Sequence, residues 1–280
     1  WTVGALGARQ ESVQATFDVR PDRTVQVAAS GRSGGTVDVA GTITLDSQHN
    51  RNALSQQLVR ELAETLDAVG DARVVVLRHE GPAFCAGADL RGTGGEAADF
   101  TARYTGALTR LLDHPKPTIA RVQGAAFGGA VGLVSCCDMA VGTTRASFAL
   151  SEVKIGLIPA TISPYVIRAI GERAARRYFT TGERFGAETA LRIGLLSEVV
   201  AEGELDAGVA SMVDAILANG PLAVRAAKDL VAGVAGRTLD RELIEDTCAR
   251  IAHIRVSDEG QEGLQAFLQK RAPAWQGNED

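Results

Sequence analysis

Residues 116–159 read KPTIARVQGAAFGGAVGLVSCCDMAVGTTRASFALSEVKIGLIP. Thr118–Val122 is a short apolar, β-branched run after two prolines, which predicts a buried strand. Three glycines follow, Gly124, Gly128 and Gly129, and then Ala130–Met139 has the length and composition of a buried helix. A glycine turn between a strand and a helix directs unpaired N–H groups and the positive end of the helix dipole at one point. Such a turn can hold a phosphate or the oxygen of a polarised carbonyl.

Two familiar phosphate-binding motifs do not fit this turn. A dinucleotide fingerprint needs G-x-G-x-x-G, and Gly124-Ala-Ala-Phe-Gly128-Gly129 departs from that spacing. A P-loop ends in G-K-[ST], and the turn contains no lysine. On this stretch alone, a tight turn whose glycines only allow close helix packing remains an open alternative.

Composition narrows the class of protein. A chain of 280 residues with 45% hydrophobic residues fits one large globular domain, alone or with an appendage. The net charge of −5, with both signs spread along the chain, argues against a nucleic-acid surface. No apolar run is long enough to predict a membrane span, and no signal peptide is visible. Four cysteines lack a C-x-x-C spacing, which favours buried free thiols in a reducing cytoplasm: Cys85, Cys136, Cys137 and Cys248.

Strands and helices alternate through the first two thirds of the chain. Residues 1–24 are expected to form a ragged leader, and alternation in 25–45 predicts a hairpin that leads into a strand. A helix is predicted from Asn52, with leucines on one face, followed by a strand over Arg73–Arg78 and a helix near 95–112. This order predicts βαβ units and a largely parallel sheet in a core over 25–204.

The alternation stops near residue 205, where a helical C-terminal segment is predicted over 205–280. Its four expected helices are Leu205–Leu217, Leu222–Val234, Thr238–Ile254 and Ser257–Lys270. Asn219-Gly220-Pro221 is a stop signal followed by a start signal, so the first two of these helices are expected to be separate.

A second turn after a strand, Phe84-Cys-Ala-Gly-Ala-Asp-Leu90, joins the first in a recognisable order. Together the two turns resemble those of the crotonase (enoyl-CoA hydratase/isomerase) superfamily. The resemblance continues through Cys137-Asp138, Phe148, Glu152, Gly156, Pro159, Ala169-Ile170-Gly171, Thr181–Phe185 and Ala190–Leu195. It implies an α/β crotonase fold, in which repeated ββα units form a stacked-sheet, spiral core, and an enzyme that acts on an acyl-CoA thioester.

In that superfamily the thioester passes through an enolate whose oxygen must be held. The resemblance places the N–H groups of Ala88 and Gly129 as the two donors of an oxyanion hole, where backbone donors need no reorganisation as charge develops. Gly128 and Gly129 would let the thioester approach without a Cβ in the way. Further residues are implied at the CoA and substrate site: Arg51, Ala86, Ala88, Asp89, Leu90, Gly132 and Lys270. No separate cofactor or metal is implied.

Hydratases of the superfamily commonly carry two glutamates. One lies three residues after the second oxyanion glycine, and this chain has Gly132 there. The other corresponds to Glu152, whose apolar neighbours are expected to raise its pKa by desolvation. A salt bridge from Glu152 to Lys154 or Arg145 is the alternative role. The sequence therefore predicts an enoyl-CoA hydratase-like enzyme with one proton-transfer carboxylate, with an enoyl-CoA isomerase or an acyl-CoA binder without turnover as alternatives.

The finer resemblance is to bacterial methylglutaconyl-CoA and isohexenylglutaconyl-CoA hydratases, which implies a branched or carboxylated acyl group. Arg168, Arg173, Arg176 or Arg177 would then be able to meet a distal carboxylate, although helix-surface charge is the alternative for most of them. The resemblance also implies a homotrimer or dimer of trimers, in which Lys270 approaches the CoA phosphate of a neighbouring subunit.

Overall fold

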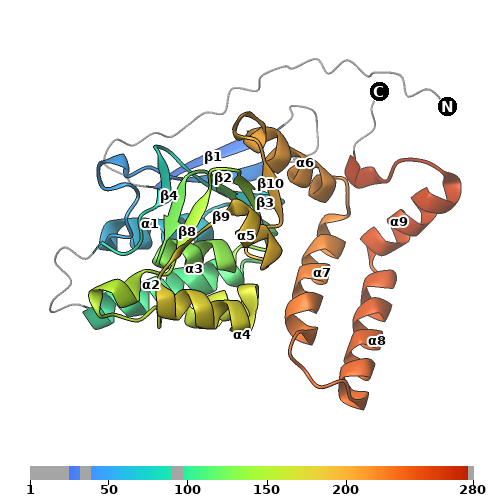
Figure 1. The fold of residues 1–280 in the computed structure, drawn as a ribbon. Helices are drawn as coiled ribbons and strands as arrows, with labels where there is room; N and C mark the ends of the chain where they lie inside the picture. Colours follow the sequence, from blue (N-terminus) through green and yellow to red (C-terminus); the bar gives the residue numbers. More distant parts are fainter. Residues whose placement is uncertain (1–24, 32–38, 90–96, 277–280) are drawn as a thin grey trace.

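A computed structural model describes residues 25–31, 39–89 and 97–276 (Figure 1). A six-stranded sheet has the order β1-β2-β3-β5-β7-β10. Its strands are β1 (Val25–Gly31), β2 (Val39–Leu45), β3 (Val74–His79), β5 (Thr118–Val122), β7 (Met139–Thr143) and β10 (Glu198–Val200). β1 pairs with β2 as the predicted antiparallel hairpin, and every other neighbouring pair in this sheet is parallel.

A second, four-stranded sheet has the order β4-β6-β8-β9. It consists of β4 (Ala83–Cys85), β6 (Ala125–Phe127), β8 (Ser147–Ala149) and β9 (Arg184–Gly186). β4, β6 and β8 run parallel, and β9 is antiparallel to β8. Three successive units, which begin with β3-β4, β5-β6 and β7-β8, each place one strand in the large sheet, the next in the small sheet, and then a helix. This arrangement confirms the expected α/β fold of repeated ββα units.

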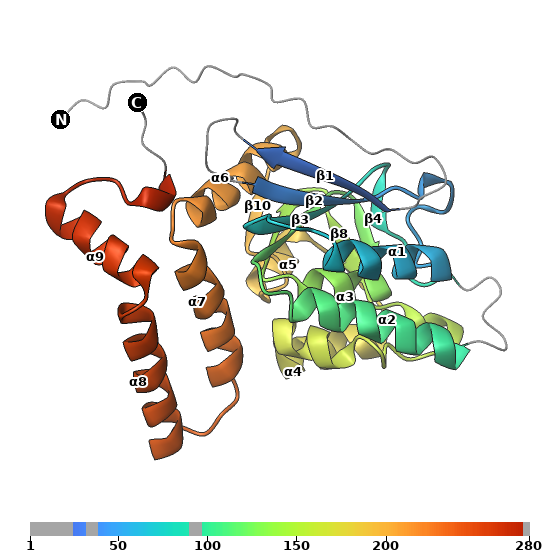
Figure 2. The same ribbon diagram turned by 180° about the vertical axis from the view of Figure 1, so that it is seen from behind.

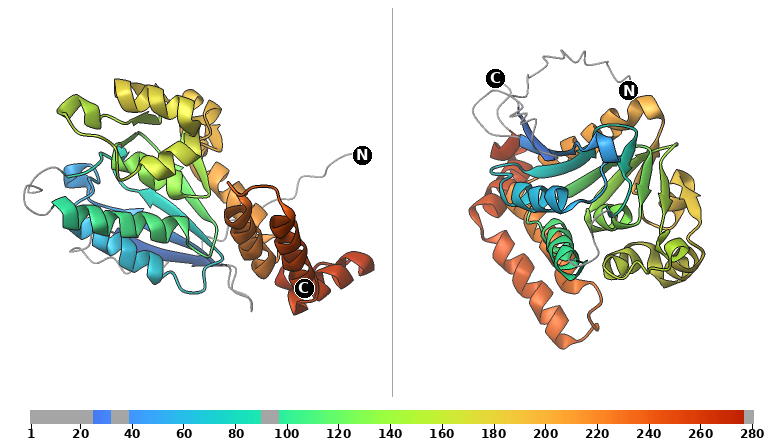
Figure 3. Two further views of the ribbon diagram at one scale, coloured as in Figure 1. Left: turned by 90° about the horizontal axis from the view of Figure 1, so that it is seen from below. Right: turned by 90° about the vertical axis from the view of Figure 1, so that its left-hand side faces the viewer.

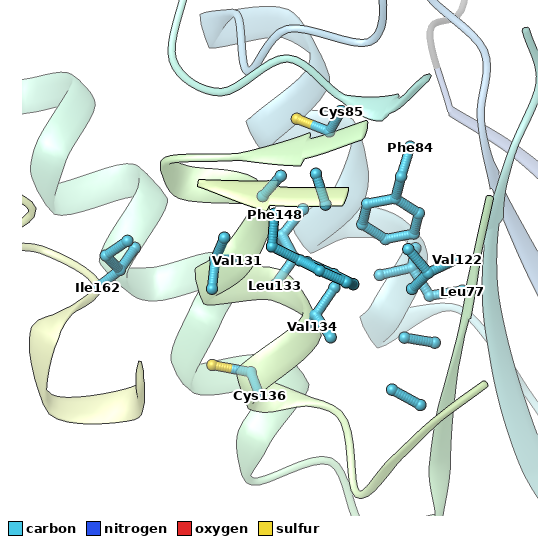
Figure 4. Close-up of a cluster of buried hydrophobic side chains, with 14 of the residues drawn as sticks. Leu77, Phe84, Cys85, Val122, Val131, Leu133, Val134, Cys136, Phe148 and Ile162 are labelled. Atoms are coloured by element: carbon cyan, nitrogen blue, oxygen red, sulfur yellow. The ribbon is translucent and has the colours of Figure 1, made fainter. Parts of the chain in front are cut away.

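Helices cover the core (Figure 2). The core helices are α1 (Gln56–Asp67), α2 (Ala97–Leu112), α3 (Gly129–Cys136), α4 (Ser163–Thr181) and α5 (Ala187–Arg192), with short 3-10 turns η1 (Gln48–Asn50), η2 (Glu152–Ile155), η3 (Glu202–Glu204) and η4 (Ala274–Gln276). Buried side chains from both sheets and from α3 meet in one apolar cluster that includes Phe84, Phe148 and Leu133 (Figure 4). Packing against the sheets therefore explains why α3 is apolar on all sides.

Two predicted helix boundaries were wrong. α1 begins at Gln56, after the N-cap Ser55, because Arg51 and Asn52 have φ angles of 58° and 55° and cannot enter a right-handed helix. α3 ends at Cys136 rather than Met139, because Cys137 is extended and Met139 opens the buried strand β7. The expectation of buried cysteines also fails at Cys248, which is exposed on the C-terminal helix that carries it.

The C-terminal helices have two different roles. α6 (Leu205–Leu217) packs on the large sheet, where Leu205 and Val209 join a second buried cluster. α7 (Pro221–Val234), α8 (Arg241–Arg255) and α9 (Asp258–Gln269) pack on one another in an arm that stands away from the core (Figures 1 and 3). Lys228 Nζ ties α7 to the core through the Asp138 carboxylate at 2.7 Å. The segment predicted to begin at 205 thus contains one core helix and a separate three-helix arm.

The described residues contain no single helix that is long and apolar enough to cross a membrane. Among the described helices, only the pair Glu202–Leu217 and Pro221–Val234 meets the length and composition test together, with a bend of 104° between its members.

One buried side chain holds the loop that precedes α1. The Asn52 side chain is fully buried, accepts a hydrogen bond from Ser47 N, and donates to the carbonyl oxygens of Glu80 and Ala83. These bonds fasten the Arg51–Leu54 loop to the turn between β3 and β4. They also stabilise the left-handed conformation at Asn52, which an amide side chain tolerates better than most.

We expect Asn52→Ala to lower the free energy of unfolding by about 3 kcal/mol, because it leaves buried backbone donors and acceptors unpaired. Urea denaturation measures the change. Gln48→Ala is the control, since the Gln48 amide makes an exposed contact with Asp46. Equal stability of the two variants would contradict the role given to Asn52.

Candidate active site

Three loops leave the same edge of the small sheet. In the parallel pairing, Cys85 at the end of β4 aligns with Ala126, and Phe127 at the end of β6 aligns with Ala149 at the end of β8. Because the carboxyl ends of parallel strands meet at one edge, the segments that follow these strands lie together, as ligand-binding loops of α/β proteins do. They carry Ala88, then Gly128 and Gly129, and then Glu152.

The first two loops approach so closely that glycine is required. A Cβ on Gly87 would lie 2.9 Å from the Phe127 carbonyl oxygen, and Gly87 has a φ of 97°. At the amino-terminal end of the same strand pair, a Cβ on Gly124 would lie 2.2 Å from the Pro82 carbonyl oxygen. Backbone therefore packs directly on backbone at both ends of the β4–β6 pair.

The Ala88 N–H is left without an acceptor by the way this loop pairs with Leu54. Leu54 N donates to Gly87 O at 2.8 Å, and Asp89 N donates to Leu54 O at 3.1 Å. Successive N–H groups of an extended chain point to opposite sides, so the Ala88 N–H points away from Leu54. It has no hydrogen-bond acceptor among the residues that the structure describes.

The Gly129 N–H is unpaired for a different reason. Gly129 is the first residue of α3, and the first N–H groups of a helix have no partner within it. The preceding Gly128 has φ 52° and ψ −119°, and its own N–H donates to Ala149 O at 2.8 Å. No other described residue accepts from the Gly129 N–H, so it is available together with that of Ala88.

Glu152 brings a carboxyl group to the same place. Glu152 is the first residue of η2 and the third residue after the end of β8. A Cβ on Gly128 would lie 2.9 Å from Glu152 Oε1. Burial raises the pKa of Glu152 above the ordinary glutamate value, and a hydrogen bond from its own backbone only partly opposes this. Within the described residues its Oε2 is buried without a hydrogen-bond partner. Arg145, the alternative salt-bridge partner, pairs instead with Glu202 at 3.0 Å.

Gly132 faces an occupied space. A Cβ there would lie 2.4 Å from Ile162 Cγ2 and 3.1 Å from the Tyr104 hydroxyl oxygen. Ile162 lies beside α3 near Val131 (Figure 4). A glutamate therefore cannot be placed at 132 unless the Ile162 side chain moves.

A side chain at Gly129 meets the same restriction, since its Cβ would lie 2.5 Å from Leu54 Cδ1. Both glycines pack against the core on the side where a Cβ would project. A Gly129→Val substitution would therefore disturb the packing of Leu54 as well as the candidate site.

The other predicted CoA-site residues are distributed unevenly. Ala86 is exposed beside the first turn, and its N–H donates to Arg51 O at 3.0 Å, which brings the exposed Arg51 next to that turn. Asp89 is half-buried, and Leu90 lies outside the described residues. Lys270 is exposed at the end of α9, on the arm and away from the loops of its own chain (Figure 1).

The arginines considered for a distal carboxylate lie on α4, and two of them already have partners. Arg176 is paired with Glu172, and Arg177 with Glu183 at 2.7 Å. The four-residue spacing of Arg176 and Glu172 is typical of a charge pair on a helix surface, whereas Glu183 lies just beyond the end of α4. The part of the chain that the structure describes contains no cluster of three metal-binding side chains.

Two residues near the site were missed by the sequence reasoning. Asn52 and Tyr104 are both buried polar side chains that hydrogen-bond to backbone groups of the loops, and Tyr104 OH donates to Gly129 O at 2.5 Å. For Tyr104 the sequence offers only a weak signal, which is the aromatic residue Phe100 one helical turn earlier. The two rings stack with their centroids 6.1 Å apart.

The comparisons with known proteins agree with this geometry. A family model described as Enoyl-CoA hydratase/isomerase matches residues 37–278. Carnitinyl-CoA dehydratase from Proteus mirabilis is 34% identical over 242 residues, which cover 81% of this chain and 91% of that protein. Human enoyl-CoA hydratase domain-containing protein 3, mitochondrial, is 32% identical over 247 residues, covering 85% of this chain and 81% of that one.

A solved structure gives the same result for the fold. An enoyl-CoA hydratase from Shewanella pealeana matches with a TM-score of 0.82 and 39% identity, covering 89% of this chain and 95% of that chain. The match extends over the core and the helices that follow it. The chain belongs to the enoyl-CoA hydratase/isomerase family, the crotonase superfamily.

Proposed function

We propose that this protein is an enoyl-CoA hydratase that adds water reversibly to a 2-enoyl-CoA thioester. The observation that carries the proposal is the convergence of Glu152 with the N–H groups of Ala88 and Gly129, because Glu152 Oε2 and both N–H groups lack a hydrogen-bond partner among the described residues. Relatives that are named as an enoyl-CoA hydratase and as a dehydratase support this direction of chemistry. A cytoplasmic location, expected from the cysteine pattern, is part of the proposal.

The two N–H groups would hold the thioester oxygen. As water attacks the β-carbon, a C–O bond forms and the π electrons move onto that oxygen, which becomes an enolate. Fixed backbone donors stabilise this charge, and removing one donor of such a pair typically slows a reaction by about a hundredfold or more. Ala88 and Gly129 would therefore stabilise the negative charge on the enolate oxygen, while Glu152 would transfer the proton.

Glu152 would serve both proton transfers. Its carboxylate accepts a proton from the attacking water, and it then returns that proton to the α-carbon as the enolate collapses. One carboxylate is sufficient because the proton that is taken is also the proton that is returned. Burial raises the pKa of Glu152, which brings the group closer to working pH and favours this exchange.

An isomerase is the second candidate, and the closed space at Gly132 favours it. Because Ile162 and Tyr104 fill that space, no second carboxylate accompanies Glu152 there. A single carboxylate can move a proton between two carbons of an enoyl thioester without water. A binder without turnover is the third possibility, which the raised pKa of Glu152 makes less favourable.

We propose that the acyl group of the substrate is branched, and we do not propose that it carries a distal carboxylate. Three large apolar side chains next to Glu152 are exposed, Ile155, Leu157 and Ile158. Arg176 and Arg177 already pair with glutamates of this chain, which argues against their binding a carboxylate of the substrate. For the CoA part, we propose contacts with Arg51, Ala86, Asp89 and Leu90, and with Lys270 of a neighbouring subunit.

Incubation of the purified protein with a panel of straight, branched and carboxylated enoyl-CoAs tests these alternatives. Hydration removes the conjugated-enoyl absorbance and adds the mass of water. Isomerisation moves the double bond at constant mass, and a binder causes neither change. Isomerisation alone across the panel would overturn the hydratase proposal.

We expect Glu152→Gln to lower kcat by about a hundredfold to ten-thousandfold, since general acid–base catalysis is worth that much. Affinity for a product-like acyl-CoA should change little, because the backbone donors remain. Stopped-flow absorbance and calorimetric titration measure the two quantities. Glu202→Gln is the control, because Glu202 pairs with Arg145 on the surface. Full activity of Glu152→Gln would assign the proton transfer to another group.

The pH profile follows from the same role. If the ionised Glu152 carboxylate starts the reaction, kcat/KM falls as the pH drops through its pKa in the free enzyme. Because burial raises that pKa, the inflection should lie above the ordinary glutamate value of 4.5. Initial rates in constant-ionic-strength buffers, with the fold checked by circular dichroism at each pH, measure it. An inflection at or below the ordinary value would contradict a desolvated Glu152.

We also propose a homotrimer, or a dimer of trimers, as the resemblance implies. The arm supports assembly because several of its large apolar side chains are exposed, including Val231, Leu239, Ile251, Phe267 and Leu268. Exposed apolar faces of this extent are typical of surfaces that a partner covers.

Phe267→Glu should therefore shift the protein from trimer toward monomer, because Phe267 is 82% exposed on α9 and a charge would be costly in a covered interface. Light scattering coupled to size exclusion measures the mass. Gln265→Glu on the same helix is the matched control. A monomeric wild-type protein at micromolar concentration would contradict the assembly.

A further inference from the structure

One buried polar group near the site has no part in the chemistry described above. Tyr104 lies on α2 and is 4% exposed, and its hydroxyl donates to the carbonyl oxygen of Gly129 at 2.5 Å. α2 packs along α3, so this bond joins two neighbouring helices (Figure 2). It ends on the same residue whose N–H faces the carboxyl edge of the small sheet.

The peptide that carries the Gly129 N–H needs outside support. It joins Gly128 to Gly129, two residues without a side chain, and α3 has no side-chain cap at this end. Glycine has the largest range of backbone conformations, so such a peptide is not fixed by its own residues. Its own carbonyl, Gly128 O, accepts from Val131 N at 2.9 Å. The peptides on either side of it are held by two further bonds: Gly128 N donates to Ala149 O, and Tyr104 OH donates to Gly129 O.

The glycines also make the space for the phenol. Cβ atoms on Gly129 and Gly132 would lie 3.2 Å and 3.1 Å from the Tyr104 hydroxyl oxygen. The hydroxyl thus lies over the first turn of α3, where side chains at either position would crowd it. This gives Gly132 a structural role, since the absence of a side chain there leaves room for the Tyr104 hydroxyl.

The phenol is well suited to hold a fixed position. Its ring stacks on Phe100 at an interplanar angle of 17°. Burial raises the pKa of Tyr104 well above its ordinary value, so the hydroxyl keeps its proton and remains a donor. Packing orients the ring, and the retained proton makes the bond to Gly129.

We propose that Tyr104 is a positioning residue that fixes the Gly129 N–H in the oxyanion hole. It acts through the Gly129 backbone and does not contact the substrate. The proposal rests on the proposed function, because it requires that the Gly129 N–H hold the thioester oxygen.

Tyr104→Phe tests the proposal, because it keeps the ring packing and removes only the donor. We expect kcat to fall by about tenfold to a hundredfold, since small displacements of catalytic groups have effects of this size, while KM changes less. Tyr165→Phe is the matched control, because the Tyr165 hydroxyl has only a long, 3.4 Å contact with Thr109 Oγ1. A purely structural role would lower the melting temperature without separating kcat from KM.

A spectroscopic measurement tests the oxyanion hole and the role of Tyr104 separately. The absorbance of 4-(dimethylamino)cinnamoyl-CoA shifts to the red when its thioester oxygen accepts hydrogen bonds. Wild-type protein should produce this shift, and Tyr104→Phe should reduce it. No shift with the wild-type protein would overturn the oxyanion hole itself, whereas an equal shift and equal kcat in Tyr104→Phe would overturn only the role of Tyr104.

A second substitution keeps the test possible if the Tyr104→Phe variant does not fold. Incorporation of 4-aminophenylalanine at 104 keeps a weaker N–H donor in the same place. It should restore part of the red shift and part of kcat relative to the phenylalanine variant. If the phenylalanine variant does not fold, the aminophenylalanine protein is compared with wild type directly, and an unchanged shift and kcat would overturn the proposal.

Discussion

The parallel pairing of β4, β6 and β8 is the constraint on which the site depends. Each strand is only three residues long, yet their shared direction brings three loops to one edge of the small sheet. Gly87 and Gly124 allow the backbones to approach within the distance that this pairing needs. The two free N–H groups and the Glu152 carboxyl are neighbours because of this register, although they are far apart in sequence.

Space, rather than charge, distinguishes this chain at position 132. The absence of a second carboxylate could have left an open pocket for water. Ile162 and Tyr104 instead fill the position, so α3 leaves no space there for a larger side chain. Because of this close packing, a single substitution of Gly132 by a large residue is expected to be destabilising unless its neighbours move.

Local pattern predicted the regular elements well where it was strong. The strand over Thr118–Val122, the hairpin and the helix over Leu205–Leu217 occur where they were expected. It failed at Asn52, where two left-handed residues delay the helix to Gln56. It also missed β4, β6 and β8 as strands, since three residues are too few to show a period of two. Short strands of this kind form because a neighbour pairs with them.

The sequence by itself determined that two glycine turns follow strands, that a glycine stands at 132 and that Glu152 has apolar neighbours. Those features depend on residue type and local order, and they were enough to place the chain in its superfamily. Only the tertiary structure decided which groups meet. The bonds from Asn52 to Ala83 and from Tyr104 to Gly129 join residues 31 and 25 positions apart. Such contacts follow from how helices and sheets pack, and no local periodicity encodes them.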